Sequence, residues 1–282
     1  MRRQGTGRIA ESRYPEARHP EAWQLEMFSR SLKKRQKLQS LLQLIGTTDG
    51  KRCLLITNGD NTGALNYHFR AHGGDWTWVE NEGEHVAEMA ALLGAPVLRG
   101  APDAIPVESS SQDLVLSIDV HEHLDDCAPF NRELARVACP GGLIVVSTPN
   151  GDPRKPVARL KTLVGMNEEQ YGHKVVGYTI PQHEEMLRAA GMEPLRSASY
   201  SGVVTETIEL AINFLYVKVL GTGSGTRAGT IAPVSGSQLR AVGLPYKVYS
   251  LLFPLLVLVS SLDRLLPFGE GYAVSVVARR PA

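Results

Sequence analysis

The sequence predicts an α/β protein built on a doubly wound, mostly parallel sheet, with helical additions at the N-terminus and before the last strand. Short apolar segments alternate with amphipathic ones between residues 53 and 147. Strands that alternate with helices need crossover connections, which make neighbouring strands parallel. The first apolar segment, residues 53–57, ends in a polar turn flanked by Gly59 and Gly63. A parallel sheet binds its ligands at such corners.

The composition is that of a globular protein. Of 282 residues, 43% are hydrophobic and 21% charged, which favours neither general disorder nor a polytopic membrane protein. The net charge of +1 predicts no nucleic-acid partner. Cys53, Cys127 and Cys139 lack the close paired spacing of a zinc or redox site, which favours a cytoplasmic location. The basic, polar N-terminus lacks the apolar segment of a signal peptide.

The N-terminal region divides into an arm and a helix. Residues 1–21 carry five arginines among Pro, Gly and Glu and predict a flexible basic arm. Residues 22–45 place apolar side chains at helical spacing and predict a helix that covers the following site as a lid. For the basic run Lys33, Lys34, Arg35 and Lys37, a solvated helix face is favoured, and contact with phosphate or an anionic membrane is the alternative.

The central elements follow from periodicity and bring acidic residues to one edge. We expect helices at residues 64–71, 84–93 and 129–137, and strands at residues 53–57, 76–80, 96–99, 114–118 and 143–147. Glu80 ends the second strand, where a carboxylate can accept hydrogen bonds from both hydroxyls of a ribose. Asp119 follows the fourth strand and reaches the same edge.

Motifs between residues 100 and 150 keep a characteristic order and spacing: Ser111-Gln112-Asp113-Leu114-Val115, Val120-His121-Glu122-His123-Leu124, Arg132-Glu133-Leu134-Ala135-Arg136-Val137, Pro140-Gly141-Gly142 and Ser147-Thr148-Pro149-Asn150. Together they strongly resemble the class I S-adenosylmethionine-dependent methyltransferases, in particular the type 11 small-molecule group. The resemblance implies a Rossmann-like, seven-stranded, mostly parallel sheet with an antiparallel C-terminal strand. It also implies S-adenosylmethionine as the cofactor.

The same resemblance implies which residues contact the cofactor. The turn after the first strand would hold the methionine moiety, the end of the second strand the ribose, and the loop before the fourth strand the adenine. The residues after the fourth strand would line one side of the cofactor site. In this order the positions are Thr57, Gly59, Asp60, Asn61 and Gly63; Glu80 and Asn81; Asp103 and Ala104; and Ile118, Asp119 and His123.

Two positions depart from the family pattern. Thr57 replaces a carboxylate and Asn61 replaces the middle glycine of the loop. A carboxylate facing the positive end of the cofactor would contribute about 1.5–3 kcal/mol, which Asp60 or Asn61 can partly replace. The sequence therefore leaves open a second function, a catalytically degenerate methyltransferase-like binding or scaffold protein at a membrane surface.

Catalytic candidates are histidines. Methyl transfer needs aligned donor and acceptor, and a general base only when the acceptor must lose a proton. His173, in the loop after the fifth strand, and His121 are the candidate bases, whereas His123 is favoured as a packed wall residue. No metal site is expected. Asp119, His121 and His123 alternate so that a strand could point them at one ion, but the resemblance has no use for one.

Residues 205–265 predict an apolar helical insertion. A helix at 206–220 and a flexible Gly/Ser/Thr tract at 221–236 precede the apolar run 244–262, which Pro254 interrupts and which is short for a spanning helix. A hydrophobic hairpin packed on the core or on a second subunit is favoured. The alternative is contact of residues 240–265 with a membrane, which would suit a lipid-like acceptor.

The predicted organisation is a flexible arm at 1–21, a methyltransferase core with its lid helix at 22–204, the insertion at 205–265 and a closing strand within 266–282. The predicted function is S-adenosylmethionine-dependent methyl transfer to a small-molecule or lipid-like acceptor. The sequence leaves open whether the chain forms a homodimer and whether it lies peripherally on the inner face of a membrane.

Overall fold

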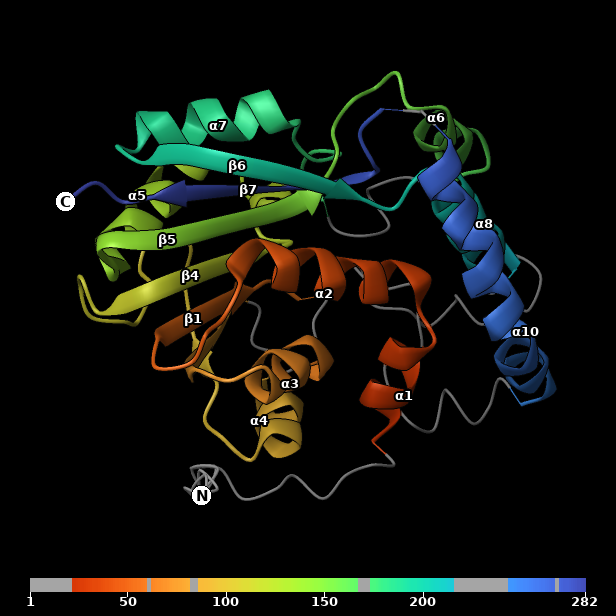
Figure 1. The fold of residues 1–282 in the computed structure, drawn as a ribbon, viewed down its shortest axis with the longest axis horizontal. Helices are drawn as coiled ribbons and strands as arrows, with labels where there is room; N and C mark the ends of the chain where they lie inside the picture. Colours follow the sequence, from red (N-terminus) through yellow and green to blue (C-terminus); the bar gives the residue numbers. More distant parts are fainter. Residues whose placement is uncertain (1–21, 60–61, 82–85, 167–172, 216–242, 267–268) are drawn as a thin grey trace, which may run out of the picture.

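Seven strands form one sheet in the order β3-β2-β1-β4-β5-β7-β6 (Figure 1). The computed structural model describes residues 22–59, 62–81, 86–166, 173–215, 243–266 and 269–282. All neighbouring strands pair in parallel except at β7, which runs antiparallel to both β5 and β6. The predicted Rossmann-like sheet is confirmed, and its strand order reverses between β1 and β4, where such sheets bind ligands.

The strand bounds agree with the predicted segments in the centre and differ at the edges. They are β1 Arg52–Thr57, β2 Asp75–Glu80, β3 Leu98–Arg99, β4 Gln112–Ile118, β5 Ala138–Pro149, β6 Glu193–Tyr200 and β7 Ala273–Arg279. β5 begins five residues earlier than predicted, because Ala138 already pairs with Gln112 and Gly142 accepts a hydrogen bond from the Arg280 amide at 3.0 Å. β3 is shorter than predicted and forms the sheet edge.

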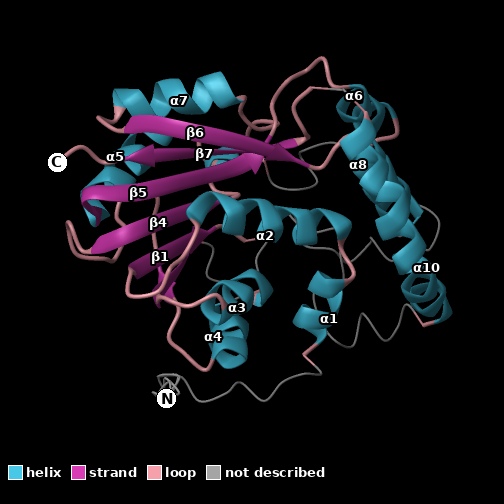
Figure 2. Cartoon of the chain, viewed as in Figure 1, coloured by secondary structure: helices cyan, strands magenta, loops and turns pink. Residues whose placement is uncertain are grey.

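Helices cover both faces of the sheet (Figure 2). On one face, Leu55 and Leu116 pack with side chains of α2 Leu32–Ile45, α3 Ala64–Ala71 and α4 Val86–Leu93. On the other, Leu54 and Val115 pack with α5 Cys127–Val137 and α7 Ile180–Ala189. Neighbouring strand residues point to opposite faces, so apolar residues at every position give two cores with the sheet between them.

The predicted single N-terminal helix is two helices, α1 Trp23–Ser29 and α2. Ser31 lies in extended backbone between them, and its Oγ accepts a hydrogen bond from the Lys34 amide at 3.3 Å. Serine at this position caps a new helix, and this interrupts the continuous helix that the apolar spacing predicted.

The C-terminal insertion stands beyond the carboxyl ends of the parallel strands (Figure 1). It contains α8 Val203–Phe214, α10 Leu244–Ser260 and η5 Ser261–Leu265, and α6 Pro156–Leu163 lies next to it. The predicted helix at 206–220 begins at Val203, and residues 216–242, including the Gly/Ser/Thr tract, lie outside the described residues.

The apolar run is one helix and not the hairpin that the sequence favoured. Pro254 lies inside α10, and only Phe253 and Ser260 of this helix are buried. Among the described residues, Leu244–Leu265 is the one helical segment long and apolar enough to cross a membrane. An 18-residue stretch of it has a mean hydropathy of 1.6, and 11% of that stretch is buried. The monomer therefore does not bury this segment in its core.

Candidate active site

The loop after β1 requires glycine at the start of α3. Gly63 has φ +92° and is the residue before the first turn of α3. A Cβ at this position would lie 3.3 Å from both the Met89 Cα and the Leu92 Cδ2 of α4. Both the left-handed backbone and the close approach of α4 therefore exclude larger residues. Asp60 and Asn61, predicted to contact the cofactor, lie outside the described residues.

Glu80 is joined to this loop by two hydrogen bonds. Thr57 and Glu80 are register partners at the ends of β1 and β2. The Glu80 carboxylate is fully buried and accepts hydrogen bonds from the Thr57 hydroxyl at 2.6 Å and from the Gly59 amide at 2.7 Å. The threonine that replaces the family's carboxylate therefore donates to the acid of the neighbouring strand, which fixes the direction of Glu80.

Asn81 brings further polar atoms to the end of β2. Its amide donates to the Thr57 carbonyl at 3.0 Å. Its side-chain nitrogen and oxygen are both buried and have no hydrogen-bond partner within the described part of the chain. Buried amide groups are nearly always paired, so a pair of unsatisfied atoms beside Glu80 suits a polar ligand. Asp103 and Ala104 are exposed in the turn that follows β3.

The end of β4 meets α2 through an ion pair. Asp119 has a φ of +53°, a conformation that non-glycine residues adopt rarely and that clusters at functional sites. Lys37 of α2 donates to its carboxylate. Burial opposes the charge of Lys37, but Asp119 outweighs this effect and holds the pKa of Lys37 above its ordinary value.

A small cavity lies between these elements. It has a volume of about 50 Å³ and is lined by residues of α1, α2, α3 and the ends of β1 and β4: Phe28, Lys34, Lys37, Thr57, Asn58, Thr62, Ala64, Leu65, Ile118 and Asp119. Pockets that hold small-molecule ligands have roughly 300–1,000 Å³. Of the predicted contacts that the structure describes, three belong to this lining, Thr57, Ile118 and Asp119, and seven lie outside it: Gly59, Gly63, Glu80, Asn81, Asp103, Ala104 and His123. The polar groups suit a cofactor, but the cavity is smaller than the pockets that hold ligands of this kind.

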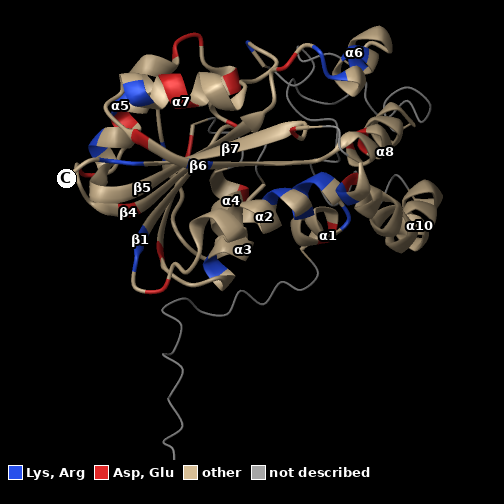
Figure 3. Cartoon of the chain, turned by 45° about the horizontal axis from the view of Figure 1, so that its top comes forward, with Lys and Arg blue, Asp and Glu red and all other residues tan. Residues whose placement is uncertain are grey.

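Figure 3 shows Lys and Arg residues along α2. This basic run is not simply the solvated face that the sequence favoured, because two of its lysines pair with acids. Besides Lys37, Lys33 donates at 3.1 Å to Glu206 of α8, which also accepts hydrogen bonds from Lys161 and from the Ser201 hydroxyl. Burial raises the pKa of Glu206, but the two lysines outweigh it and lower this pKa to about 2. The sequence did not predict this cluster, which fastens the lid to the C-terminal insertion.

The two predicted bases have different environments. His121 is fully buried, its Nε2 lies 2.8 Å from the Asn131 Oδ1, and its ring packs edge-on against Phe130. Burial lowers its pKa to about 4. His121 and His123 belong to a 3-10 turn, η1 His121–His123, and not to a strand. Their side chains therefore point in different directions and do not face one common ion. His121 consequently has no access to an acceptor.

His173 meets η1 from the loop after β5. Its ring lies 4.8 Å from the His123 ring, nearly perpendicular to it. Burial and the neighbouring His123 lower the pKa of His173 to about 4. Between the two histidines in the fold stands Glu122, a fully buried carboxylate that the sequence analysis missed. Its signal was an acid flanked by two histidines in an otherwise apolar motif.

Comparison with known proteins agrees with this geometry. Residues 58–146 match the family model described as a methyltransferase domain. An uncharacterized methyltransferase of Mycobacterium sp. (strain KMS) is 33% identical over 102 residues, which are 36% of this chain and 40% of the relative. A probable S-adenosylmethionine-dependent methyltransferase of Mycobacterium tuberculosis (strain H37Rv) is 50% identical over 46 residues, 16% of this chain and 17% of that protein. The matched part thus spans at most 40% of these relatives. The cofactor that the matches indicate is S-adenosylmethionine.

Solved structures share the fold at low identity. A possible histamine N-methyltransferase of Thermotoga maritima superposes with a TM-score of 0.55 at 17% identity, covering 92% of this chain and 93% of that chain. The [4+2]-cyclase SpnF superposes with a TM-score of 0.54, also at 17% identity, covering 95% of this chain and 86% of its own. Since a cyclase has the same fold, the reaction has to be argued from the site.

Proposed function

The chain carries a class I methyltransferase domain, and from this premise we propose that it transfers a methyl group from S-adenosylmethionine to a lipid-like acceptor. The observation that carries the proposal is the position of Glu80, a buried carboxylate at the end of β2 that is held against the loop after β1. When bound, the cofactor supplies a methyl group already activated on a sulfonium. The protein has to bind it, orient it and exclude water.

The residues at the edge of the sheet divide this work. Glu80 would accept hydrogen bonds from the ribose hydroxyls, and the two unsatisfied side-chain atoms of Asn81 would pair with polar groups of the same nucleoside. Thr57 would act indirectly, because its hydroxyl directs the Glu80 carboxylate. Ile118 would supply apolar wall at the cavity between β1 and β4.

The lid would have to open for the cofactor to enter. Lys37 bridges α2 to Asp119 across the 50 Å³ cavity, and Lys33 fastens the same helix to Glu206. Outward movement of α1 and α2 would break the first contact and expose the ends of β1 and β4. Closure would then exclude water around the reacting groups.

A lipid-like acceptor is supported by the surface of the insertion. α10 exposes large apolar side chains along its length, with exposed fractions of 80% at Leu251 and 66% at Leu258. The exposed cations Lys247 and Arg264 lie near the two ends of this apolar surface. Such a helix binds at the interface of an anionic membrane, its apolar face among acyl chains and its cations near headgroups. Its place beyond the carboxyl ends of the strands would bring an acceptor from the membrane towards the site (Figure 1).

Calorimetric titration with S-adenosylmethionine and S-adenosylhomocysteine tests the cofactor site. We expect binding with a Kd in the micromolar range, about −8 kcal/mol. No heat at millimolar cofactor would reject the proposal and favour the second candidate, a degenerate methyltransferase-like scaffold at a membrane surface, which the same exposed helix supports.

Liposome flotation tests the membrane surface separately. The native chain should float with anionic vesicles, and the variant Leu251→Ser/Leu255→Ser/Leu258→Ser should stay in solution. Leu98→Ser/Leu195→Ser removes exposed apolar side chains of β3 and β6 and serves as the matched control. If the native chain instead stays in solution and forms a dimer that the α10 variant loses, the helix packs on a second copy and the membrane proposal fails.

A further inference from the structure

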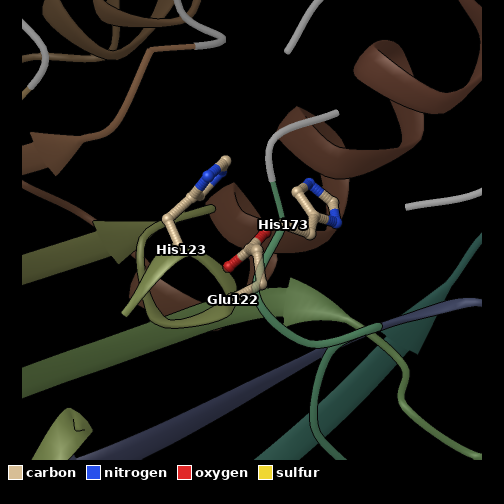
Figure 4. A group of neighbouring side chains, drawn as sticks. All are labelled: Glu122, His123 and His173. Atoms are coloured by element: carbon tan, nitrogen blue, oxygen red, sulfur yellow. The ribbon is translucent and has the colours of Figure 1, made fainter. Parts of the chain in front are cut away.

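Three side chains beside the cofactor cavity converge in a way that methyl transfer as proposed above does not use. Glu122, His123 and His173 each place one ligand atom within 4.8 Å of the other two. In Figure 4 the Glu122 carboxylate stands between the two imidazole rings, which come from different segments of the chain. A carboxylate and two imidazoles are the donor set of many catalytic metal sites.

The backbone holds this arrangement in place. The Glu122 carbonyl accepts hydrogen bonds from the Lys174 amide at 2.8 Å and from the Val175 amide at 3.3 Å, so the loop that carries His173 is fastened to η1. The His123 amide donates to the Val120 carbonyl at 3.0 Å within the same 3-10 turn. A site whose supporting backbone is already fixed loses little entropy when a ligand binds.

The chemistry of the cluster suits a divalent ion of the first transition row. Metal ligation takes imidazole in its neutral form and carboxylate in its ionised form, so binding of the ion is coupled to release of protons. Zinc is bound by nitrogen and carboxylate oxygen at about 2.0–2.2 Å, which places neighbouring ligand atoms about 3–3.5 Å apart. The ligand atoms of the three side chains would therefore have to approach one another by up to about 1.5 Å, a change that side-chain rotation supplies.

The surrounding charges also permit a cation. Lys33 and Lys37 act electrostatically on His173, but each is paired with an acid, Glu206 and Asp119 respectively. In the forms that metal ligation requires, two neutral imidazoles and one ionised carboxylate, the three ligands together carry one negative charge. A divalent ion would reverse the sign of a buried charge and leave one net positive charge at the site.

We infer that Glu122, His123 and His173 bind a divalent transition-metal ion, of which Zn²⁺, Mn²⁺ and Co²⁺ are the members to test. Three protein ligands leave at least one coordination position for water or another oxygen. Asp119 both lines the cofactor cavity and acts electrostatically on His173, so the ion would border that cavity. This role rests on the proposed function: the open position would hold an acceptor hydroxyl, orient it toward the methyl group and favour loss of its proton.

Metal titration of the full chain, without an affinity tag and after dialysis against chelator, tests this inference. Co²⁺ should add visible absorption bands that saturate at one equivalent, and Zn²⁺ should displace it. Glu122→Gln and His173→Ala should each weaken binding by about 100-fold, since each removes a direct ligand. His72→Ala, which removes an exposed histidine on the surface, should bind as the native chain does.

Thermal unfolding of the same samples, followed by circular dichroism, separates loss of the site from loss of the fold. His173→Ala should unfold at the same temperature as the native chain, because His173 is only partly buried. Absence of a saturable signal in the native chain, or equal binding by His173→Ala, would overturn the inference. Titration with S-adenosylhomocysteine on the same samples separates the two proposals. Cofactor binding without metal binding rejects the metal site alone, and metal binding without cofactor binding rejects the methyltransferase proposal alone.

Discussion

Replacing Glu80 by glutamine should weaken cofactor binding without unfolding the loop after β1. The carboxylate is buried and accepts hydrogen bonds from the Thr57 hydroxyl and the Gly59 amide. Glutamine has nearly the same volume. Its carbonyl oxygen can accept from the Gly59 amide while its NH₂ group donates to the Thr57 hydroxyl, because a hydroxyl can reverse its role. The variant therefore keeps the local structure and loses the negative charge.

The expected loss follows from the number of hydrogen bonds that the charge strengthens. A hydrogen bond to a charged group contributes about 1.5–3 kcal/mol, against about 0.5–1.5 kcal/mol for a neutral pair. If the two ribose hydroxyls each lose about 1 kcal/mol, binding weakens by about 2 kcal/mol, which corresponds to about a 30-fold rise in Kd. An alanine at this position would also leave the Thr57 and Gly59 donors unpaired, so it would overstate the effect.

Calorimetry with S-adenosylhomocysteine measures the change, and Glu108→Gln, which removes an exposed carboxylate elsewhere on the surface, is the control. Urea unfolding of both variants shows whether stability is retained. A Kd for Glu80→Gln within about threefold of the native value, at unchanged stability, would mean that Glu80 shapes the loop but does not hold the ribose.

Three further predictions concern stability. Folding lowers the pKa of His121 from 6.5 to about 4, so between these pH values the unfolded chain binds more protons than the folded chain. The free energy of unfolding should therefore fall by up to about 3 kcal/mol as the pH drops from 6.5 to 4. In urea titrations, His121→Gln should lack this contribution to the pH dependence of stability. Lys37→Met leaves Asp119 without its ion pair and should lower the free energy of unfolding by about 2–3 kcal/mol. The double variant Lys37→Met/Asp119→Asn should regain more than half of this loss. If the losses of the two single variants instead add in the double-mutant cycle, the two residues are not directly coupled. Phe253→Ala removes the one buried apolar side chain of α10 and should lower the free energy of unfolding by about 3 kcal/mol. Amide hydrogen exchange should become faster in α10 but not in β4. Unchanged protection in α10 would show that other contacts hold the helix.

The sequence by itself determined the sheet and the edge of the sheet at which a ligand is expected. Apolar runs of strand length, separated by helical periodicity, predict a parallel sheet, and the order of motifs between residues 100 and 150 implied the antiparallel closing strand. The positions of Gly63 before a helix and of Glu80 at the end of a strand were predicted correctly because their signals are local. A glycine at a strand-to-helix turn and an acid at the end of a strand have the same meaning wherever the rest of the chain folds.

Only the tertiary structure decided how side chains from distant segments combine. Strand register brings Thr57 onto Glu80, and helix packing turns Lys37 and Lys33 inward to Asp119 and Glu206. The same packing leaves most of the apolar surface of α10 exposed, although composition had favoured burial.

The histidines illustrate the physical reason. A strand would have pointed His121 and His123 to the same side, whereas a 3-10 turn sends His121 into the core and brings His123 to Glu122 and to His173 of a later loop. Periodicity specifies one element at a time. The direction of a side chain relative to another element depends on the backbone conformation at each turn and on long-range packing, and neither is encoded in spacing alone.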